Sequence, residues 1–355
     1  MDIVAHRLHN QQLVVSQFRT PAQVAAWFGA IQSQDYPGGK WAIGLRLANA
    51  TDADVEQAIA DRQIIRTWPM RGTLHFVAAE DVRWMLEALT PRVVAGAAGR
   101  HRQLELDEAT FARSRKVIAA ALEGGRRLSR PAMYATLEAA GVSTQGQRGF
   151  HILGRLAQEG LICFGPHEGK QPAFVLLDEW APNAKRLARD IALAELARRY
   201  FTSHGPATLQ DFVWWSGLTV ADARAGLEAA KGELVEERVS GQSYWLPSGL
   251  PSVGAQRPLI HLLPAYDEYM VAYRDRSAAL AAAAAGGLAP PSATILGPTI
   301  LVDGQFAGVW RRTVRKDVVT IATQPCVPLD DAARDALADV ANRYAAFIGL
   351  RAHLR

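Results

Sequence analysis

Short helical stretches alternate with pairs of short strands in the pattern of hydrophobic and polar positions. In the middle of the chain this pattern predicts helices over 107–123, 130–140 and 147–159. The apolar face of the third helix is formed by Phe150, Leu153, Leu156 and Ala157. Two strand-like runs follow, 161–164 and 174–177, with a polar loop between them. Three helices and a hairpin in this order are typical of a winged helix-turn-helix module.

The same order of elements recurs after residue 183. A long helix is predicted over 184–203. A second helix begins after Gly205-Pro206-Ala207-Thr208 and ends near Gly217, and a third spans 219–231. A hairpin follows around Gly241. We therefore expect another winged-helix module here.

The N-terminal segment fits the same plan. Helices over 21–31 and 51–60 precede a hairpin that pairs 64–67 with 73–77. The pattern thus predicts three modules over roughly 250 residues, which is a length that suits several small domains.

The pattern changes from about Arg257 onward. Strands are predicted over 259–263, 299–302, 305–310 and 317–321. Asp303-Gly304 is a strong signal for a two-residue hairpin, and a final amphipathic helix is predicted over 330–347. The Ala-, Gly- and Pro-rich stretch 278–291 is expected to be a surface connection.

These patterns divide the chain into four predicted domains. They are winged helices over 1–98, 99–182 and 183–250, and a small β-rich domain closed by a helix over 251–355. The fold class is therefore α+β.

Composition excludes several classes of protein. Of the 355 residues, 49% are hydrophobic and 21% are charged, which is ordinary for a globular chain. No apolar run reaches the ~18 residues that a membrane span needs, and the N-terminus lacks the pattern of a secretory signal. Cys163 and Cys326 are the two cysteines, which argues against a disulfide scaffold and favours a reducing cytoplasm.

The charge permits nucleic acid as a partner without proving it. The net charge is 39 − 35 = +4, and only six of the basic residues are lysine. Arginine suits bidentate contacts to phosphate, but arginine-rich codon usage explains the same bias. Charge alone therefore leaves both explanations open.

Common catalytic signatures are missing from the sequence. It has no phosphate-binding loop, dinucleotide-binding glycine motif, nucleophile elbow or zinc-binding His-Glu-x-x-His. His6 and His9 have no carboxylate or cysteine partner at metal-ligand spacing, so no metal site is expected. Asp267 and Glu268 are adjacent, and on a strand they would point to opposite faces. Pairing with Arg274 or Arg276 is as good an interpretation as catalysis.

Four stretches between residues 30 and 312 are similar to segments of one known family. They are Ala30–Asp35, Arg66–His75, Leu262–Tyr269 with Tyr273–Arg276, and Val302–Gly304 with Gly308–Arg312. In this order they resemble the AlkZ/YcaQ-like DNA glycosylases, a bacterial family of tandem winged-helix proteins. The family's catalytic signature is Gln, a small or apolar residue, then Gln or Asp. Here it reads Gln32-Ser33-Gln34.

Gln34 stands where the YcaQ-like branch has Asp, so the chain resembles the AlkZ-like branch, associated with bulky N7-alkylated purines and interstrand crosslinks. The resemblance implies three tandem winged helices in a C-shape, a C-terminal β-barrel-like domain, and glutamines that face the concavity. It also implies that no metal or organic cofactor is needed. Ser33 departs from the pattern, because it is smaller and more polar than the typical apolar middle residue.

The chemistry of the glutamine pair narrows the substrate. Glutamine does not titrate, so Gln32 and Gln34 act neither as general acid nor as general base. A purine alkylated at N7 is cationic and leaves as a neutral base, so it needs no proton from the enzyme. Two amide carbonyls can then orient a water and stabilise an oxocarbenium-like sugar. We expect Gln34 to hold the water and Gln32 to position it or brace the deoxyribose.

Several further residues are candidates for contacts to DNA. They are Arg66, Arg71, His75, Arg148, Arg155, Arg274, Arg276, Arg311 and Arg312. For Arg66 and Arg71 the alternative is a salt bridge to Asp61 or Glu56, and for His75 it is the hairpin core. Core packing is also the expectation for Trp214, Trp215 and Trp310.

The predicted partner is double-stranded DNA, bound by a monomer in the cytoplasm at the nucleoid. Two other functions compete with the glycosylase. One is a regulator that binds DNA without catalysis, and the other is a winged-helix module for protein contacts. Salt-dependent DNA binding would separate the last from the first two.

Overall fold

Three β-sheets and the helices packed on them make up the computed structural model, which describes residues 1–169, 171–248 and 258–355. The expected domain boundary at 250/251 and the change of pattern at Arg257 lie outside these described residues. No helix in the described ranges is both long and apolar enough to cross a membrane.

The N-terminal segment contains more helices than its pattern predicted. Its elements are α1 (Ile3–Asn10), α2 (Pro21–Phe28), β1 (Ile31–Gln32), α3 (Tyr36–Gly44), α4 (Asp52–Ala60), β2 (Ile64–Met70), β3 (Thr73–Ala78) and α5 (Val82–Gly96). The predicted helix α4 and the β2–β3 hairpin are confirmed. The helix predicted over 21–31 ends at Phe28, where Gly29 takes a positive φ of 75°, and Ile31–Gln32 form the strand β1. The helix α3 was missed because Pro37-Gly38-Gly39 is typical of a loop. Gly39 is needed here, because a Cβ on it would lie 2.9 Å from the Cα and Cβ of Ser33.

The middle segment follows its predicted order. It comprises α6 (Ala98–Gln103), α7 (Glu108–Leu122), β4 (Leu128–Ser129), α8 (Arg130–Ala139), α9 (Arg148–Gln158), β5 (Ile162–Glu168), β6 (Gln171–Leu176) and α10 (Leu177–Trp180). One detail of α9 was wrong: Phe150 is 51% exposed, and Ile152 is buried with the other apolar residues of the helix. Ile152 lies one helical turn before Leu156, so it belongs to the same buried face of the helix.

The third segment confirms the predicted helices and hairpin. Its elements are α11 (Arg189–His204), α12 (Leu209–Ser216), α13 (Val220–Ala230), β7 (Leu234–Val239) and β8 (Gln242–Pro247). Local sequence sets the ends of α12. Thr208 and Asp211 form a capping box at its start, and Gly217 takes a left-handed conformation (φ 71°) at its end.

The C-terminal segment is an open, half-barrel sheet with helices beside it. It contains β9 (Ile260–Leu263), α14 (Glu268–Val271), α15 (Ser277–Ala285), α16 (Ser292–Ile295), β10 (Thr299–Val302), β11 (Gln305–Arg315), β12 (Val318–Pro325), α17 (Asp331–Phe347) and β13 (Arg351–Leu354). The strand order is β13-β12-β11-β10-β9. The expectation of a mere surface connection over 278–291 was wrong, because α15 buries Ala279 and Ala283.

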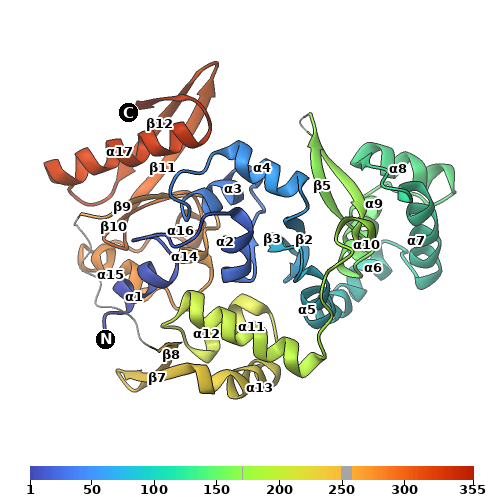
Figure 1. Cartoon of the computed structure of the whole chain (residues 1–355), viewed down its shortest axis with the longest axis horizontal. Coiled ribbons are helices and arrows are strands. Elements are labelled where there is room, and N and C mark those ends of the chain that lie inside the picture. Colours follow the sequence, from blue (N-terminus) through green and yellow to red (C-terminus); the bar gives the residue numbers. More distant parts are fainter. Residues whose placement is uncertain (170, 249–257) are drawn as a thin grey trace.

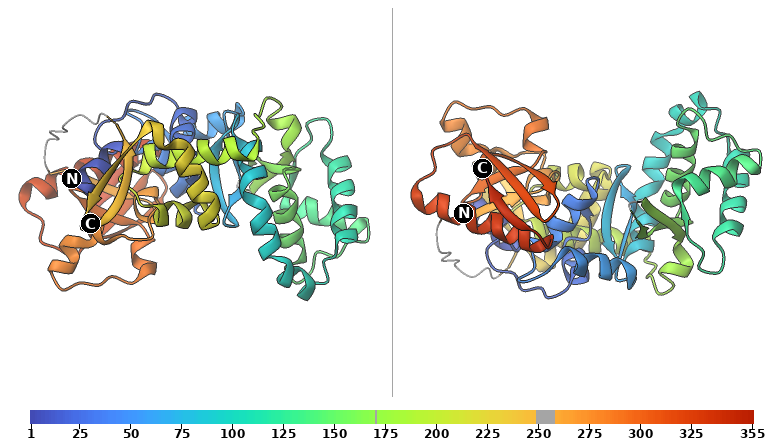
Figure 2. Two further views of the ribbon diagram at one scale, coloured as in Figure 1. Left: turned by 90° about the horizontal axis from the view of Figure 1, so that it is seen from below. Right: turned by 90° about the horizontal axis from the view of Figure 1, so that it is seen from above.

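The hairpins of the first two segments form one sheet. Its order is β1-β3-β2-β5-β6-β4, and Arg66 of β2 pairs with Phe164 of β5. This sheet lies between the N-terminal helices and the helices of residues 98–158 (Figure 1). Both chain termini lie at one end of the molecule, with the residues around 100–150 at the other end (Figure 2). The sheet therefore bridges two segments that the sequence pattern treats separately.

The N-terminal segment shares its hydrophobic core with the C-terminal sheet. Trp41 of α3 packs against Tyr344 and Phe347 of α17, with ring centroids 5.0 Å apart in both pairs. A fully buried ion pair joins the same two segments: Arg46 donates two hydrogen bonds of 2.8 Å to Asp267. The predicted pairing of Asp267 with Arg274 or Arg276 is therefore wrong.

This buried ion pair gives the first prediction. Asp267→Asn keeps the shape of the side chain but leaves the buried Arg46 without its counter-charge. We expect the free energy of unfolding to fall by about 3–5 kcal/mol, measured by urea denaturation. The matched control is Asp331→Asn, in an exposed pair with Arg334, which should change stability by less than about 0.5 kcal/mol. Equal effects of the two substitutions would contradict the assignment.

Candidate active site

Gln32 and Gln34 lie at the edge of the six-stranded sheet. Gln32 of β1 is paired with His75 of β3, and the Ser33 amide continues the pairing by donating to the Leu74 carbonyl at 2.8 Å. Along an extended strand, alternate residues share a face. Gln34 is exposed and Gln32 is 6% exposed, whereas Ser33 is completely buried. Ser33 therefore points inward and Gln34 lies at the surface, whereas Gln32 is itself buried.

The orientation of each glutamine amide follows from its partner. The Leu74 amide donates to Oε1 of Gln34 at 3.1 Å, and Nη2 of Arg71 donates to Oε1 of Gln32 at 3.4 Å. Backbone N–H and guanidinium groups are donors only, so they must face the carbonyl oxygens and not the NH2 groups. Each carbonyl keeps a second lone pair, and each NH2 group points away from these partners.

Arg71 reaches this site from the turn between β2 and β3. Arg71 and Gly72 both have left-handed backbone angles, φ 54° and 73°, as the favoured two-residue hairpin turn requires. The guanidinium lies 3.4 Å from three acceptors, Oε1 of Gln32, Nε2 of His75 and the Trp214 carbonyl. Arg71 therefore connects the glutamine strand to helix α12.

His75 is a neutral, buried support for Arg71. Its Nδ1 lies 3.0 Å from the Thr73 carbonyl, so Nδ1 carries the proton and Nε2 accepts from Arg71. Burial and the positive charge of Arg71 lower the pKa of His75 to about 3. The structure therefore places His75 inside the hairpin core, which was the alternative to DNA contact.

Glu268 is a buried carboxylate behind Gln32. It accepts hydrogen bonds from the backbone N–H of Gln32 (2.9 Å), from Nε1 of Trp215 (2.9 Å) and from Nε2 of His204 (3.3 Å). Burial alone would raise the pKa of Glu268, but the surrounding groups, first the hydrogen bond from His204 and also the backbone N–H of Gln32, together outweigh burial, and the pKa is lowered. The carboxylate is therefore ionised at neutral pH. This role was not predicted from the sequence, because Asp267 caps the helix α14 and Glu268 begins it, and neither residue is on a strand.

Arg66 braces the backbone of the motif. It is 7% exposed, and its Nη2 donates to the Ser33 carbonyl at 2.8 Å. Its guanidinium lies over the rings of Tyr36 (4.9 Å) and Phe164 (5.1 Å), and burial lowers its pKa to about 10. Neither predicted alternative partner is used, since Glu56 instead binds Lys40 at 2.6 Å.

The two arginines predicted on α9 are both engaged by protein atoms. Arg148 donates to the carbonyls of Ser143 and Glu105, each at 3.1 Å. Arg155 forms ion pairs with Glu159 and with Glu108, and its side chain is 13% exposed. The contact of these two arginines with DNA stays a prediction.

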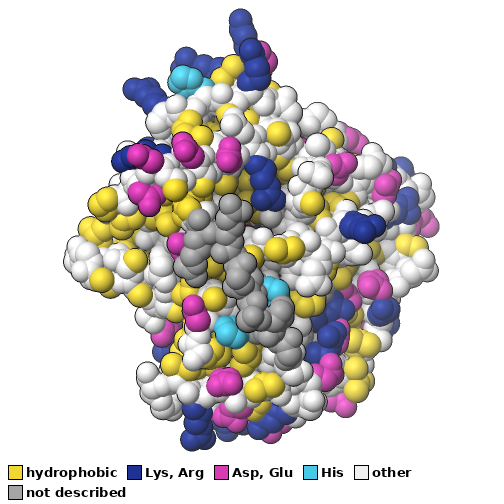
Figure 3. Space-filling view, turned by 60° about the vertical axis from the view of Figure 1, so that its left-hand side comes forward, with side chains coloured by type: hydrophobic (Ala, Val, Ile, Leu, Met, Phe, Trp, Pro, Cys, Tyr) yellow, Lys and Arg dark blue, Asp and Glu magenta, His cyan; other side chains and the backbone are white. Residues whose placement is uncertain are grey.

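The arginines of the C-terminal segment differ in exposure. Arg274 is exposed and its Nη1 donates to Gln210 at 3.2 Å, whereas Arg276 is half-buried and donates to the Met270 carbonyl at 2.6 Å. On β11, Arg311 is exposed, and Arg312 donates to the Tyr344 hydroxyl at 2.7 Å and lies 3.7 Å from Asp35. Lys and Arg side chains project at the top of Figure 3, the end where the β11–β12 hairpin lies in Figure 1.

The tryptophans separate into core and surface residues. Trp215 and Trp310 are buried, as expected, and Nε1 of Trp310 donates to the Leu263 carbonyl at 2.7 Å. Trp214 was expected in the core but is 45% exposed. Its neighbour Trp215 fills the inward position of α12, so Trp214 falls on the outer side of the helix.

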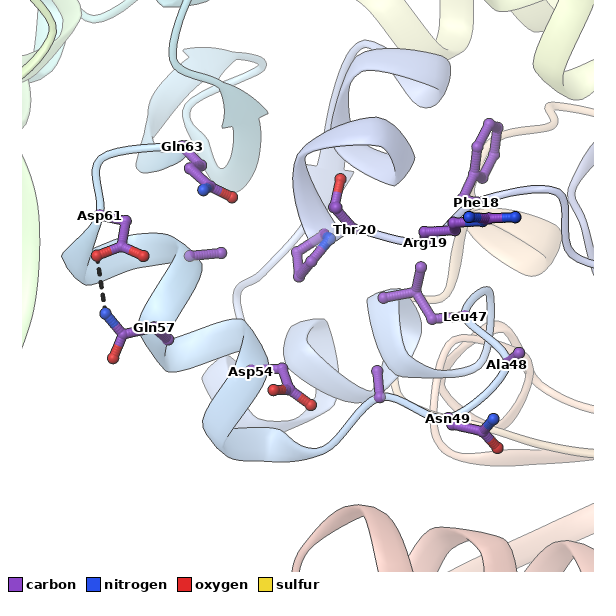
Figure 4. Close-up of a pocket in the computed structure, with 13 residues that line it drawn as sticks. Phe18, Arg19, Thr20, Leu47, Ala48, Asn49, Asp54, Gln57, Asp61 and Gln63 are labelled. Carbon is purple, nitrogen blue, oxygen red and sulfur yellow. Dashed lines mark hydrogen bonds between the residues drawn. The ribbon is translucent and has the colours of Figure 1, made fainter.

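A surface pocket lies away from the glutamines. It has a volume of about 460 Å³ and is lined by residues 18–21, the loop 47–50 and one face of α4. Figure 4 shows Gln57 and Asp61 joined across one turn of α4, by a hydrogen bond of 2.7 Å. The pocket contains none of the residues predicted to act on DNA. Within the described ranges, no group of three His, Cys, Asp or Glu side chains is placed to hold a metal ion.

Comparison with known proteins gives one consistent result. Residues 25–347 match the family described as DNA glycosylase AlkZ-like. The chain is 25% identical over 334 residues to the "Interstrand DNA cross-link repair glycosylase" of Streptomyces sahachiroi, covering 90% of this chain and 89% of that protein. The solved structure of Streptomyces sahachiroi DNA glycosylase AlkZ has a TM-score of 0.78 at 20% identity, covering 100% of this chain and 98% of that chain. The two chains therefore share their fold.

The buried Ser33 hydroxyl leads to a second prediction. Among the described residues it has no hydrogen-bond partner, and Gly39 packs closely against it. Ser33→Ala removes the unpaired hydroxyl and should leave stability equal or raise it by up to about 1 kcal/mol, in urea denaturation. Ser33→Leu should instead lower stability by about 1–3 kcal/mol, because the larger side chain meets Gly39. A loss of stability in Ser33→Ala would contradict this account.

The buried histidines lead to a third prediction. The pKa of His75 is lowered to about 3 and that of His261 to about 4, both chiefly by burial. Below pH 6.5 the unfolded chain takes up protons that the folded chain cannot, so stability falls as the pH decreases. From pH 7 to pH 5 we expect a loss of about 2 kcal/mol for each of these histidines, seen as a lower Tm.

His261→Gln tests the source of this pH dependence. Nε2 of His261 lies 2.7 Å from the Leu13 carbonyl, and a glutamine NH2 can make the same donation without titrating. The variant should lose less stability between pH 7 and pH 5 than the parent. An unchanged slope would show that His261 does not contribute.

Proposed function

The chain belongs to the AlkZ-like DNA glycosylase family, and on that premise we propose that it excises N7-alkylated purines from double-stranded DNA with Gln32 and Gln34 at the reacting sugar. As a member of this family it is an enzyme that acts on DNA and hydrolyses glycosyl bonds. The family therefore decides against a regulator without catalysis and against a module for protein contacts alone.

One observation carries the proposal. The side-chain amides of Gln32 and Gln34 lie two residues apart, and each is oriented by a donor-only partner. The histidine nearest to them, His75, stays neutral far below physiological pH. These groups supply dipoles in fixed directions and no proton at neutral pH, so they suit a base that leaves without being protonated.

An N7-alkylated purine is such a base. Its positive charge is released as the glycosidic bond breaks, so the base departs as a neutral molecule and the sugar becomes oxocarbenium-like. A water must then reach the sugar carbon, and the developing positive charge must be stabilised. Carbonyl dipoles that are already oriented do this without reorganisation at the moment of reaction.

We assign different tasks to the two amides because their surroundings differ. Gln34 is exposed, so its second lone pair and its NH2 group are open to a water. Gln32 is 6% exposed and lies between the Arg71 guanidinium and the Glu268 carboxylate, which holds its backbone. In this assignment Gln34 holds the water, and Gln32 positions that water or braces the deoxyribose.

Large lesions are included in the proposed substrate range. The Streptomyces sahachiroi relative carries the name of an interstrand cross-link repair glycosylase. A crosslinked base cannot enter a closed pocket of the kind that many glycosylases use. The exposed position of Gln34 suits access to the sugar without complete extrusion of the base.

We further propose that the chain binds DNA as a monomer through three winged helices, at 1–98, 99–182 and 183–250, that form a C-shape with the C-terminal domain. The repeated order of helices and hairpins supports this arrangement. Among the predicted arginines, Arg274 and Arg311 are exposed and suited to contacts with phosphate. Arg66 and Arg71 instead support the glutamine strand.

The catalytic assignment is tested by single-turnover excision of N7-methylguanine from a duplex. Gln32→Ala and Gln34→Ala each remove one oriented dipole, and each should slow excision by about 100-fold or more. Gln57→Ala, an exposed glutamine on α4, and Ser33→Ala should keep the parental rate within about threefold. An unchanged rate in either Gln32→Ala or Gln34→Ala would overturn the mechanism.

A further inference from the structure

Trp214 is a large aromatic residue on the surface beside the candidate active site. It is 45% exposed, whereas the adjacent Trp215 is completely buried. An exposed tryptophan leaves a large apolar area in contact with water, and such residues are enriched where proteins bind other molecules. The position of Trp214 therefore calls for a functional explanation.

The indole ring of Trp214 is fixed from two sides. Its Nε1 donates to the Val271 carbonyl at 3.1 Å, which satisfies the polar edge of the ring. The Arg276 guanidinium lies 5.5 Å from the ring centroid and is itself held by the Met270 carbonyl at 2.6 Å. What remains open to solvent is hydrocarbon surface of the ring, already held in place before anything binds.

Trp214 is also connected directly to the glutamines. Its carbonyl oxygen accepts from Nη1 of Arg71, and Nη2 of the same guanidinium donates to Oε1 of Gln32. A Cβ on Gly217, at the end of the same helix, would lie 3.0 Å from Cγ of Arg71. One side chain, that of Arg71, therefore contacts both the backbone of Trp214 and the side-chain amide of Gln32.

We propose that Trp214 is a stacking platform for an undamaged nucleobase, opposite or next to the lesion, that leaves the base stack. The inference rests on the proposed function, because it assumes that damaged DNA occupies the glutamine site. Every base has a π-face, so stacking suits a site that must accept many sequence contexts. The Arg276 guanidinium behind the ring adds a positive charge next to the base and the phosphates.

The test is binding to a duplex with a tetrahydrofuran abasic-site analogue, which needs no excision. Fluorescent 2-aminopurine is placed opposite the analogue in one duplex and beside it in another. With the parent protein we expect a change in 2-aminopurine fluorescence in one of them, which identifies the base that stacks. Trp214→Ala should abolish that change and weaken binding by about 10- to 100-fold.

Trp214→Phe is the matched control for structure. Phenylalanine also loses the hydrogen bond to Val271 but keeps an aromatic ring, so it should retain binding within about fivefold and keep the fluorescence change. Ile191→Ala, an exposed residue of α11, should behave as the parent. Equal losses in Trp214→Phe and Trp214→Ala would show a structural role and overturn the proposal. A fluorescence change in neither duplex would overturn it as well.

Failure of the proposed function would give a different result. In that case Gln34→Ala would excise N7-methylguanine at the parental rate, whatever the effect of Trp214→Ala on binding. An effect of Trp214→Ala equally large on undamaged duplex would show general DNA contact and would also overturn the stacking role.

Discussion

The buried carboxylate of Glu268 joins the parts of this protein around the candidate active site. It accepts hydrogen bonds from the backbone N–H of Gln32 in β1 and from the side chains of His204 in α11 and Trp215 in α12. These elements belong to different segments of the chain, and Glu268 itself begins a helix of the C-terminal segment. The next residue back, Asp267, forms the buried ion pair with Arg46. Loss of Glu268 would leave three buried donors unpaired, and such groups are costly in a protein interior. The glutamine strand is therefore held in place by residues that come more than two hundred positions later.

In the proposed mechanism this arrangement holds the side-chain amides of Gln32 and Gln34 through neighbouring groups and needs no titratable catalyst. The Arg71 charge lies close to Gln32 while the Glu268 carboxylate lies behind it, so the two opposite charges offset each other. Ser33 shows why a small residue suits the middle of the motif: its side chain faces inward against Gly39. In the proposed mechanism, oriented amide dipoles stabilise the cationic sugar, and the opposite charges of Arg71 and Glu268 offset each other beside them.

Local structure was predicted well where local signals are strong. Apolar periodicity and capping residues, such as Thr208 before α12, depend on neighbours within a few positions, and these helices and hairpins were confirmed. The helix α3 was missed because Pro-Gly-Gly normally marks a loop, and α15 because an alanine-rich stretch has no polar face to give it a period. Glu268 was misjudged because its helix, α14, spans only four residues. Trp214 and Trp215 are adjacent in α12, so the sequence around them is nearly the same. Only the packing of the helix decides which ring is exposed and which is buried.

The sequence by itself determined the class of the fold, the order of the helices and hairpins, and the motif whose resemblance pointed to a DNA glycosylase. Those features depend on residue types and short spacings. Only the tertiary structure decided which charged residues are exposed. Arg66, Arg148 and Arg155 are held by carbonyls, rings or carboxylates, while Arg274 and Arg311 are exposed. The joining of the first two hairpins into one sheet, and the shared core of the two ends of the chain, were likewise decided by packing. The physical reason is that burial and pairing are set by segments far apart along the chain, whose approach leaves no mark in the local pattern.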